Sequence, residues 1–350
     1  MLRSLAAFLY RHTVYYWRMR RRHPSARFSA SVEWRGGGTI NFGPGVFVGP
    51  NSVVAVDVGS SLQLGQGVWL GRDCEISAGT RMQIGERSSL QHRTQLHGDV
   101  TIGAGCIGAA NLYVSSAAHD FRVTPELPIR VQDFHRVRRP TTLRSRPVSI
   151  GDDCWLGINV VVAPGVSVGR GCIVGANSVV TRDLAPYSIA AGAPAQVVGQ
   201  RLAFKPPRDI RASDDAQLPY FYAGFRQLAD DEIADDRVHR RRGGCPAHSP
   251  FSMAMSAAAG ERVEIAVDAL TPCRIRHGKD EAKVPAGRST LSFAAMPDAL
   301  GLLQFHHDCV GTDALVVTAG RMLVGHEEAS PIPPAPPPNA ALDTGSVSIG

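Results

Sequence analysis

The sequence predicts a mainly β protein whose first half is a parallel β-helix, and two observations carry this prediction. Aliphatic residues recur at intervals of six, each followed by a small residue, at Ile150, Leu156, Val162, Val168, Val174 and Val180. A second small side chain comes four positions after each of the first five. A simple strand repeats every two residues and a helix every three or four, so a period of six indicates a short strand followed by a corner, repeated.

Three such units close one triangular coil, and stacked coils bury a continuous aliphatic column. The glycine that often follows the aliphatic residue lets the backbone take corner conformations. The repeat is present but worn from Ile40 onward, and its register is irregular before Leu64. We predict a β-helix over 36–202, entered at the three glycines 36–38.

Four motifs in the second half of the repeat carry a family resemblance. They are Ile150-Gly-Asp-Asp-Cys-Trp-Leu-Gly157, Ala163-Pro-Gly-Val-Ser-Val-Gly169, Val174-Gly-Ala-Asn-Ser-Val-Val-Thr-Arg-Asp183 and Ala191-Gly-Ala-Pro-Ala195. They resemble the C-terminal coils of the hexapeptide-repeat acyltransferases, and most closely the galactoside, maltose and polysaccharide O-acetyltransferases. The resemblance implies a left-handed β-helix, acetyl-CoA as co-substrate with no metal required, and a homotrimer with active sites between subunits.

The repeat halts after Val114 and resumes at Val148, leaving a loop over 115–147 without periodicity. The position of His119 in this loop, relative to Ile102, resembles that of the catalytic base in the O-acetyltransferases. Imidazole, with a pKa of roughly 6.5, can take the proton of a sugar hydroxyl as that hydroxyl attacks a thioester. We therefore expect His119 to be the general base; the alternative is an ordinary surface histidine. Asp120 either orients the ring or is solvated.

The resemblance also implies further site residues, position by position. The cofactor-binding candidates are Ile158, Ala176, Thr181 and Arg182, and the candidates for substrate contact are Ser89, His97 and Trp155. Arg182 stands where the family usually has lysine, while Ser89 and His97 replace the asparagine and aspartate of the simple sugar acetyltransferases. Family basic residues after 191–195 are unmatched, with Arg201 as a substitute. The acceptor is therefore not expected to be a simple galactoside.

Seven arginines lie in the 115–147 loop: Arg122, Arg130, Arg136, Arg138, Arg139, Arg144 and Arg146. They indicate either a solvated lid or a site for an anionic group. A metal site is a further alternative, because β-helical carbonic anhydrases bind zinc through three histidines. His92, His97 and His119 occur in the wrong order for that family, so no metal is expected.

We expect an acetyl-CoA-dependent O-acetyltransferase that acts on a sugar hydroxyl of a surface polysaccharide, lipopolysaccharide or precursor. The enzyme alternative is amino-sugar N-acetylation. The non-enzyme alternative is a trimeric glycan-binding scaffold served by the C-terminal domain.

The remaining segments are assigned by composition and pattern. Residues 1–35 contain an amphipathic helix with a basic end, which either contacts a membrane surface peripherally through 1–23 or packs on the trimer. Residues 203–249 form a linker with a helix, residues 250–326 a small antiparallel β-sandwich, and residues 327–350 a Pro-rich disordered tail.

The overall composition is that of an ordinary soluble protein: 350 residues, 44% hydrophobic, with a net charge of +6. Four of the seven cysteines (Cys74, Cys106, Cys154 and Cys172) take the small position of the repeat. We therefore expect buried thiols rather than a disulfide framework, and a reducing, cytoplasmic location. No nucleic-acid partner is expected.

Overall fold

The structure is a computed structural model that describes residues 14–119, 121–122, 124–137, 145–225, 245–258, 261–298, 302–310 and 314–323. The chain divides into two compact units, Met1–Phe204 and Lys205–Gly350, and each is described by itself.

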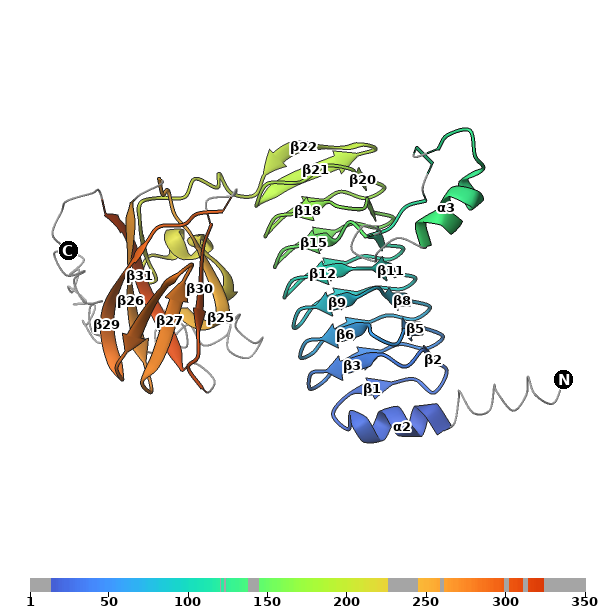
Figure 1. Cartoon of the computed structure of the whole chain (residues 1–350), viewed down its shortest axis with the longest axis horizontal. Helices are drawn as coiled ribbons and strands as arrows, with labels where there is room; N and C mark the ends of the chain where they lie inside the picture. The colour runs from blue at the N-terminus through green and yellow to red at the C-terminus, as the bar shows by residue number, and fades with distance from the viewer. Residues whose placement is uncertain are drawn as a thin grey trace, which may run out of the picture. The chain divides into compact units, whose positions relative to one another are not determined.

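The first unit is a solenoid of three parallel sheets, which we call faces A, B and C (Figure 1). Face A contains β1 (Arg27–Phe28), β4 (Phe47–Val48), β7 (Trp69–Leu70), β10 (Ser89–Leu90), β13 (Ile107–Gly108), β16 (Trp155–Leu156), β19 (Ile173–Val174), β21 (Ser188–Gly192) and the antiparallel β22 (Ala195–Gln200). Face B contains β2 (Glu33–Arg35), β5 (Val53–Val56), β8 (Glu75–Ala78), β11 (Gln95–Gly98), β14 (Tyr113–Ser115), β17 (Val161–Val162) and β20 (Val179–Val180). Face C contains β3 (Thr39–Phe42), β6 (Ser61–Leu64), β9 (Arg81–Ile84), β12 (Val100–Ile102), β15 (Val148–Ile150) and β18 (Ser167–Val168).

The six aliphatic residues of the repeat fall on the three faces in rotation. Ile150 and Val168 lie on face C, Leu156 and Val174 on face A, and Val162 and Val180 on face B; each is at most 3% exposed. One coil therefore takes three repeat units, as predicted, and the mainly β fold with a parallel solenoid is confirmed. The inward side chains form one aliphatic column along the solenoid.

The solenoid starts earlier than the sequence suggested. Strands β1 and β2 already belong to the first coil, ahead of the glycines that were expected to mark its entry. Phe28 and Trp34 fill this coil's interior in place of the usual aliphatic residues, which hid the repeat. Helix α2 (Tyr15–Arg22) packs on this coil through Met19, which is 3% exposed.

The strands of the second unit form one nine-stranded antiparallel sheet. Its main order is β28 (Asp280–Val284), β27 (Cys273–His277), β30 (Leu302–His307), β25 (Cys245–Ala254), β31 (Leu315–Leu323), β26 (Arg262–Ala269) and β29 (Gly287–Ala294), with β23 (Asp209–Arg211) and β24 (Phe221–Phe225) at the side. The unit thus includes part of the predicted 203–249 linker. The 3-10 helix η3 (Asp215–Tyr220) leads into β24. Most of the predicted linker helix, and the tail, lie outside the described residues.

Two further observations bear on the sequence expectations. Cys273, at the start of β27, and Cys309, just after the paired strand β30, form a disulfide, although no disulfide framework was expected; their separation of 36 residues in the sequence does not reveal that they are neighbours. Within the described part of the chain, no helix has the length and apolar character needed to cross a membrane.

The solenoid cysteines are buried, as predicted, and burial raises the pKa of the Cys74 thiol and brings that of Cys172 to about 11. Because the thiolate is the reactive form, folded protein should react with an alkylating reagent at half-buried Cys245 only. In denaturant, Cys74, Cys106, Cys154 and Cys172 should also be alkylated. Cys273 and Cys309 should be alkylated only after a reductant has cleaved their disulfide. Peptide mass spectrometry gives the order in which the cysteines are alkylated. A solenoid cysteine that is alkylated as fast as Cys245 would contradict the buried column.

Candidate active site

The long insertion leaves the solenoid at the corner between faces B and C, which we call corner BC, and both its ends are fixed there. The Asp99 backbone N–H donates to Ser116 Oγ (2.8 Å), and the Arg146 N–H donates to the Ser116 carbonyl (2.8 Å). The Ser116 and Ser145 hydroxyls lie 2.9 Å apart. Gly98 lies beneath Ser116 with φ +88°, and a Cβ there would collide with the Ser116 hydroxyl. The start of the insertion is therefore held in place just before His119.

Helix α3 (Ile129–Val137) forms inside the insertion and is anchored by a polar side chain. Gln132 is 5% exposed. Its Nε2 donates to the Leu127 carbonyl (2.8 Å), and its Oε1 accepts from the Thr124 N–H (3.2 Å). Its backbone N–H donates to the Pro128 carbonyl (3.1 Å). This anchoring fixes the position of the next residue, Asp133.

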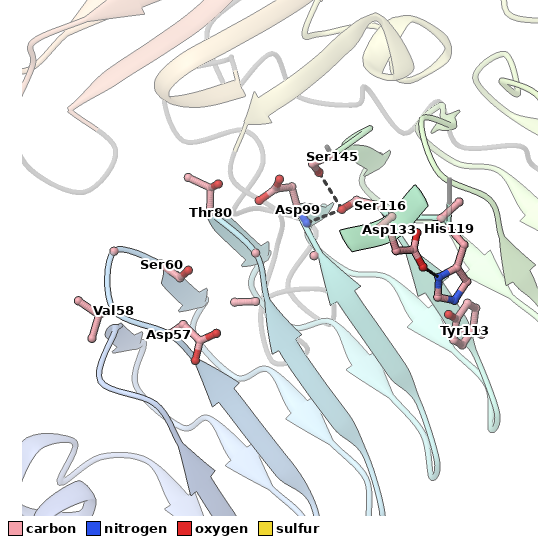
Figure 2. A pocket seen from close by; sticks show the side chains of 16 residues that line it. Asp57, Val58, Ser60, Thr80, Asp99, Tyr113, Ser116, His119, Asp133 and Ser145 are labelled. Atoms are coloured by element: carbon pink, nitrogen blue, oxygen red, sulfur yellow. Dashed lines mark hydrogen bonds and ion pairs between the residues drawn. The ribbon is translucent and has the colours of Figure 1, made fainter. Parts of the chain in front are cut away.

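Asp133 and His119 form the central pair of the candidate site. His119 Nδ1 lies 2.6 Å from Asp133 Oδ2 (Figure 2). An ionised carboxylate can only accept, so Nδ1 carries the proton and Nε2 is left with a lone pair. The His119 side chain is 80% exposed, and an ion pair so exposed adds little stability. The pair's consequence is orientation: it fixes the tautomer and holds Nε2 ready to accept a proton.

The sequence did not point to Asp133. It offered Asp120 either as the residue that orients the ring or as a solvated carboxylate, and Asp120 lies outside the described residues. Asp133 is 14 residues from His119 within a segment that shows no repeat. A helix beginning after Pro128 was the available signal, because proline favours the first positions of a helix.

A cavity of about 1070 Å³ runs along corner BC and contains His119 at one end. Figure 2 shows His119, Asp133 and Tyr113 at that end, and Asp57 and Val58 at the other. Among the sequence candidates His97 lies nearby, since its ring centroid is 5.7 Å from that of Tyr113. The cavity is open, its lining is more apolar than polar, and it reaches the candidate base.

The other predicted site residues do not share this cavity. Ile158 and Ala176 are stacked at the corner between faces A and B, Thr181 and Arg182 follow β20 at corner BC, and Ser89 and Trp155 lie on face A. Ile158 and Trp155 are 44% and 53% exposed. In a triangular coil, face A lies opposite corner BC. One chain therefore does not bring Trp155 to its own His119.

The structure also shows where Arg201 and some of the arginines of the insertion lie. Arg201 Nη1 donates to Asp153 Oδ2 (3.0 Å) and to the Gly171 carbonyl (3.0 Å), so it is engaged in holding two turns rather than free for a phosphate. Arg122, Arg130 and Arg146 are exposed and line no part of the cavity; the other loop arginines lie in segments whose side chains are not described.

Among the described residues, there is no group of three or more His, Cys, Asp or Glu side chains that could hold a metal ion. His92, one of the three histidines considered, accepts the Arg72 N–H through Nδ1 (3.3 Å) at a different corner from His119.

The solenoid is similar in sequence to known acetyltransferases. Residues 147–182 match the model described as a hexapeptide repeat of succinyl-transferase. The galactoside O-acetyltransferase of Escherichia coli K12 is 31% identical over 152 residues, 43% of this chain and 63% of that protein. WcaF of the same organism, named for colanic acid biosynthesis, is 34% identical over 105 residues, 30% of this chain and 50% of that protein.

A solved galactoside acetyltransferase in complex with coenzyme A is 23% identical, with a TM-score of 0.29, over 48% of this chain and 70% of that one. With so low a TM-score this likeness carries no argument, and the similarity to the family rests on the sequence matches. The chain spans less than two thirds of the length of these curated relatives. In its repeats and in these matches, the solenoid is similar to the hexapeptide-repeat acyltransferases.

Proposed function

We propose that the chain is an acetyl-CoA-dependent O-acetyltransferase that acts on a sugar hydroxyl of a surface polysaccharide, lipopolysaccharide or precursor. The observation that carries the proposal is the His119–Asp133 pair, which opens into a cavity on a hexapeptide-repeat solenoid. The relatives named as a galactoside O-acetyltransferase and a colanic acid biosynthesis acetyltransferase support the choice of acceptor.

The proposed reaction is direct transfer. His119 Nε2 takes the proton of the acceptor hydroxyl while its oxygen attacks the thioester carbonyl. The C–S bond then breaks, the acetyl group stays on the sugar oxygen, and His119 returns the proton to the leaving thiolate. Asp133 holds the ring through Nδ1 and stabilises the imidazolium that forms between the two transfers.

Acetyl-CoA is proposed to bind at the coils that follow the insertion. Ile158 and Ala176 are exposed and stacked, because the Asn177 N–H donates to the Ile158 carbonyl (2.8 Å) and so ties the two turns together. The side chains of Ile158 and Ala176 suit the apolar segments of the pantetheine arm. Thr181 and Arg182 are exposed at a different corner, corner BC, so in the proposed homotrimer they would supply a hydroxyl and a charge for phosphate from a neighbouring copy.

A homotrimer completes the proposed site. His119 and Trp155 lie on opposite sides of the coil, so both can line one site only if corner BC of one copy meets face A of the next. A contact between two different surfaces closes into a ring when the rotation allows it. Three copies then give three sites, each using His119 of one chain and Trp155 of another.

Amino-sugar N-acetylation is the second candidate, favoured by the three carboxylates of Asp57, Asp99 and Asp133 along the cavity. Treatment of the product with mild base separates the two reactions, since an ester is cleaved and an amide survives. We further propose a cytoplasmic location, where acetyl-CoA is available. Trp17, 65% exposed on α2, is the described residue best placed for the peripheral membrane contact.

His119→Ala should lower kcat/KM by about 10²- to 10⁴-fold, the usual contribution of a general base. Calorimetry should find acetyl-CoA binding unchanged, because the proposed cofactor residues lie on other coils. His306→Ala, an exposed histidine of the second unit, is the matched control. Near-normal turnover of the His119 variant would remove the proposal.

Asp133 is a positioning residue, and its variants should separate orientation from folding. Asp133→Ala should lower kcat by roughly 10- to 100-fold, a fraction of the full contribution of the base, with KM for acetyl-CoA and the melting temperature unchanged. Asp133→Asn should recover part of kcat, because its amide oxygen can still accept from Nδ1–H. Equal losses in both variants together with a lower melting temperature would indicate a structural role instead.

Mixed oligomers test the shared site. His119→Ala and Trp155→Ala chains, each with low activity alone, are unfolded, mixed and refolded together. About a quarter of the sites in random mixtures should then combine an intact His119 with an intact Trp155 and regain activity. Activity that stays at the level of the separate variants would show that each site is built from a single chain.

A further inference from the structure

The turns at corner BC change length along the solenoid, and this shapes the cavity. The turn between β5 and β6 is Asp57–Ser60, the next is Gly79–Thr80, and the next is Asp99 alone. The coil after that carries the long insertion. The short turns therefore form the bottom of a groove between two projections, the 57–60 turn at one end and the insertion at the other (Figure 2).

The groove is longer than one sugar ring requires. Its ends are three coils apart, or about 14 Å, since neighbouring strands lie ~4.8 Å apart. Its volume of about 1070 Å³ lies at the upper end for ligand pockets. Ala78, Gly79 and Gly98 form a floor of small residues, so nothing divides the groove into separate pockets.

Among the described residues, every charged side chain that lines the groove is acidic apart from the candidate base. Asp57, Asp99 and Asp133 line it, and among the described residues no lysine or arginine does. Arg81, next to the groove, directs its guanidinium to Gln83 Oε1 (3.2 Å), while its backbone N–H donates to Asp99 Oδ1 (2.9 Å).

Carboxylates accept hydrogen bonds from sugar hydroxyls and from ammonium groups, and they repel carboxylates and phosphates. Hydroxyls of Ser60 and Thr80 add neutral donors and acceptors to the same wall. Tyr113, 39% exposed, offers a ring face at the His119 end. This lining suits neutral or amino sugars and opposes the phosphates of coenzyme A.

We propose that this groove binds the acceptor as an extended glycan of several non-anionic rings, with the ring to be modified at His119. The inference rests on the proposed function and adds the length and charge class of the acceptor. Coenzyme A occupies the coils on the other side of the insertion, and the two substrates meet at His119. Glycans with carboxylate or phosphate groups along the chain should bind more weakly, because the described wall of the groove is acidic.

The test is direct binding of the wild-type protein, without acetyl-CoA, to an array of surface-polysaccharide fragments graded in length and charge. Neutral and amino-bearing oligomers should bind, with affinity rising from one ring to several. Anionic oligomers of equal length should bind at least tenfold more weakly. Preference for anionic fragments, equal binding of single rings and oligomers, or no bound fragment would overturn the proposal.

Asp57→Lys should weaken binding of the longer oligomers about tenfold, the usual effect of losing one hydrogen bond to a charged group. Glu75→Lys makes the same change of charge on an exposed face B residue outside the groove and is the matched control. Equal binding by the two variants would place the glycan elsewhere. Glycan binding without acetyl transfer would overturn the proposed function and leave the groove standing, whereas transfer with no sensitivity to Asp57→Lys would do the reverse.

Discussion

Strand pairing between successive coils is the constraint on which the rest of the structure depends. β12 pairs with β15 in full register, Val100 with Val148 and Ile102 with Ile150, although the whole insertion lies between them. The corner between faces A and B has no such freedom, because Asn111, Asn159 and Asn177 adopt positive φ there and join their side chains in a ladder. Corner BC does not contain this asparagine ladder, so its turns can differ in length from coil to coil without disturbing the core.

The distribution of charge along corner BC has a chemical consequence. Before the insertion the groove wall carries Asp57 and Asp99, whereas after it the corner carries the exposed neighbours Arg182 and Asp183, whose charges balance. Acetyl-CoA is rich in phosphate and a neutral or amino sugar is not, so the acidic wall before the insertion suits the proposed sugar rather than the proposed cofactor. His119 lies between the two proposed binding regions, so it could reach both substrates without moving. This is the arrangement that direct transfer requires, since both substrates must be bound at once.

The sequence predicted those features that depend on a regular repeat or a family motif. The six-residue period gave the buried column and the buried cysteines, and the motif spacing selected His119. Features made by contacts between distant segments were missed: the first coil, where Phe28 and Trp34 replace aliphatic residues, the Cys273–Cys309 disulfide, and the Asp133 partner. The groove was missed for a similar reason. Its shape comes from stacking turns of unequal length, and each turn is unremarkable when read alone.

Helix α3 indicates why the site is so open in a single chain. It buries polar Gln132 and presents Ile129, Val131 and Phe134 outward at 51%, 37% and 59% exposure, the reverse of an ordinary surface helix. Val131 and Phe134, three positions apart, lie on the same side of the helix, and exposed apolar neighbours of this kind are typical of a contact surface. The same insertion holds His119, so in the proposed homotrimer a copy that covers α3 would also cover the base and exclude water from it. Water competes with the sugar hydroxyl for the thioester, so closing this site by assembly would favour transfer over hydrolysis.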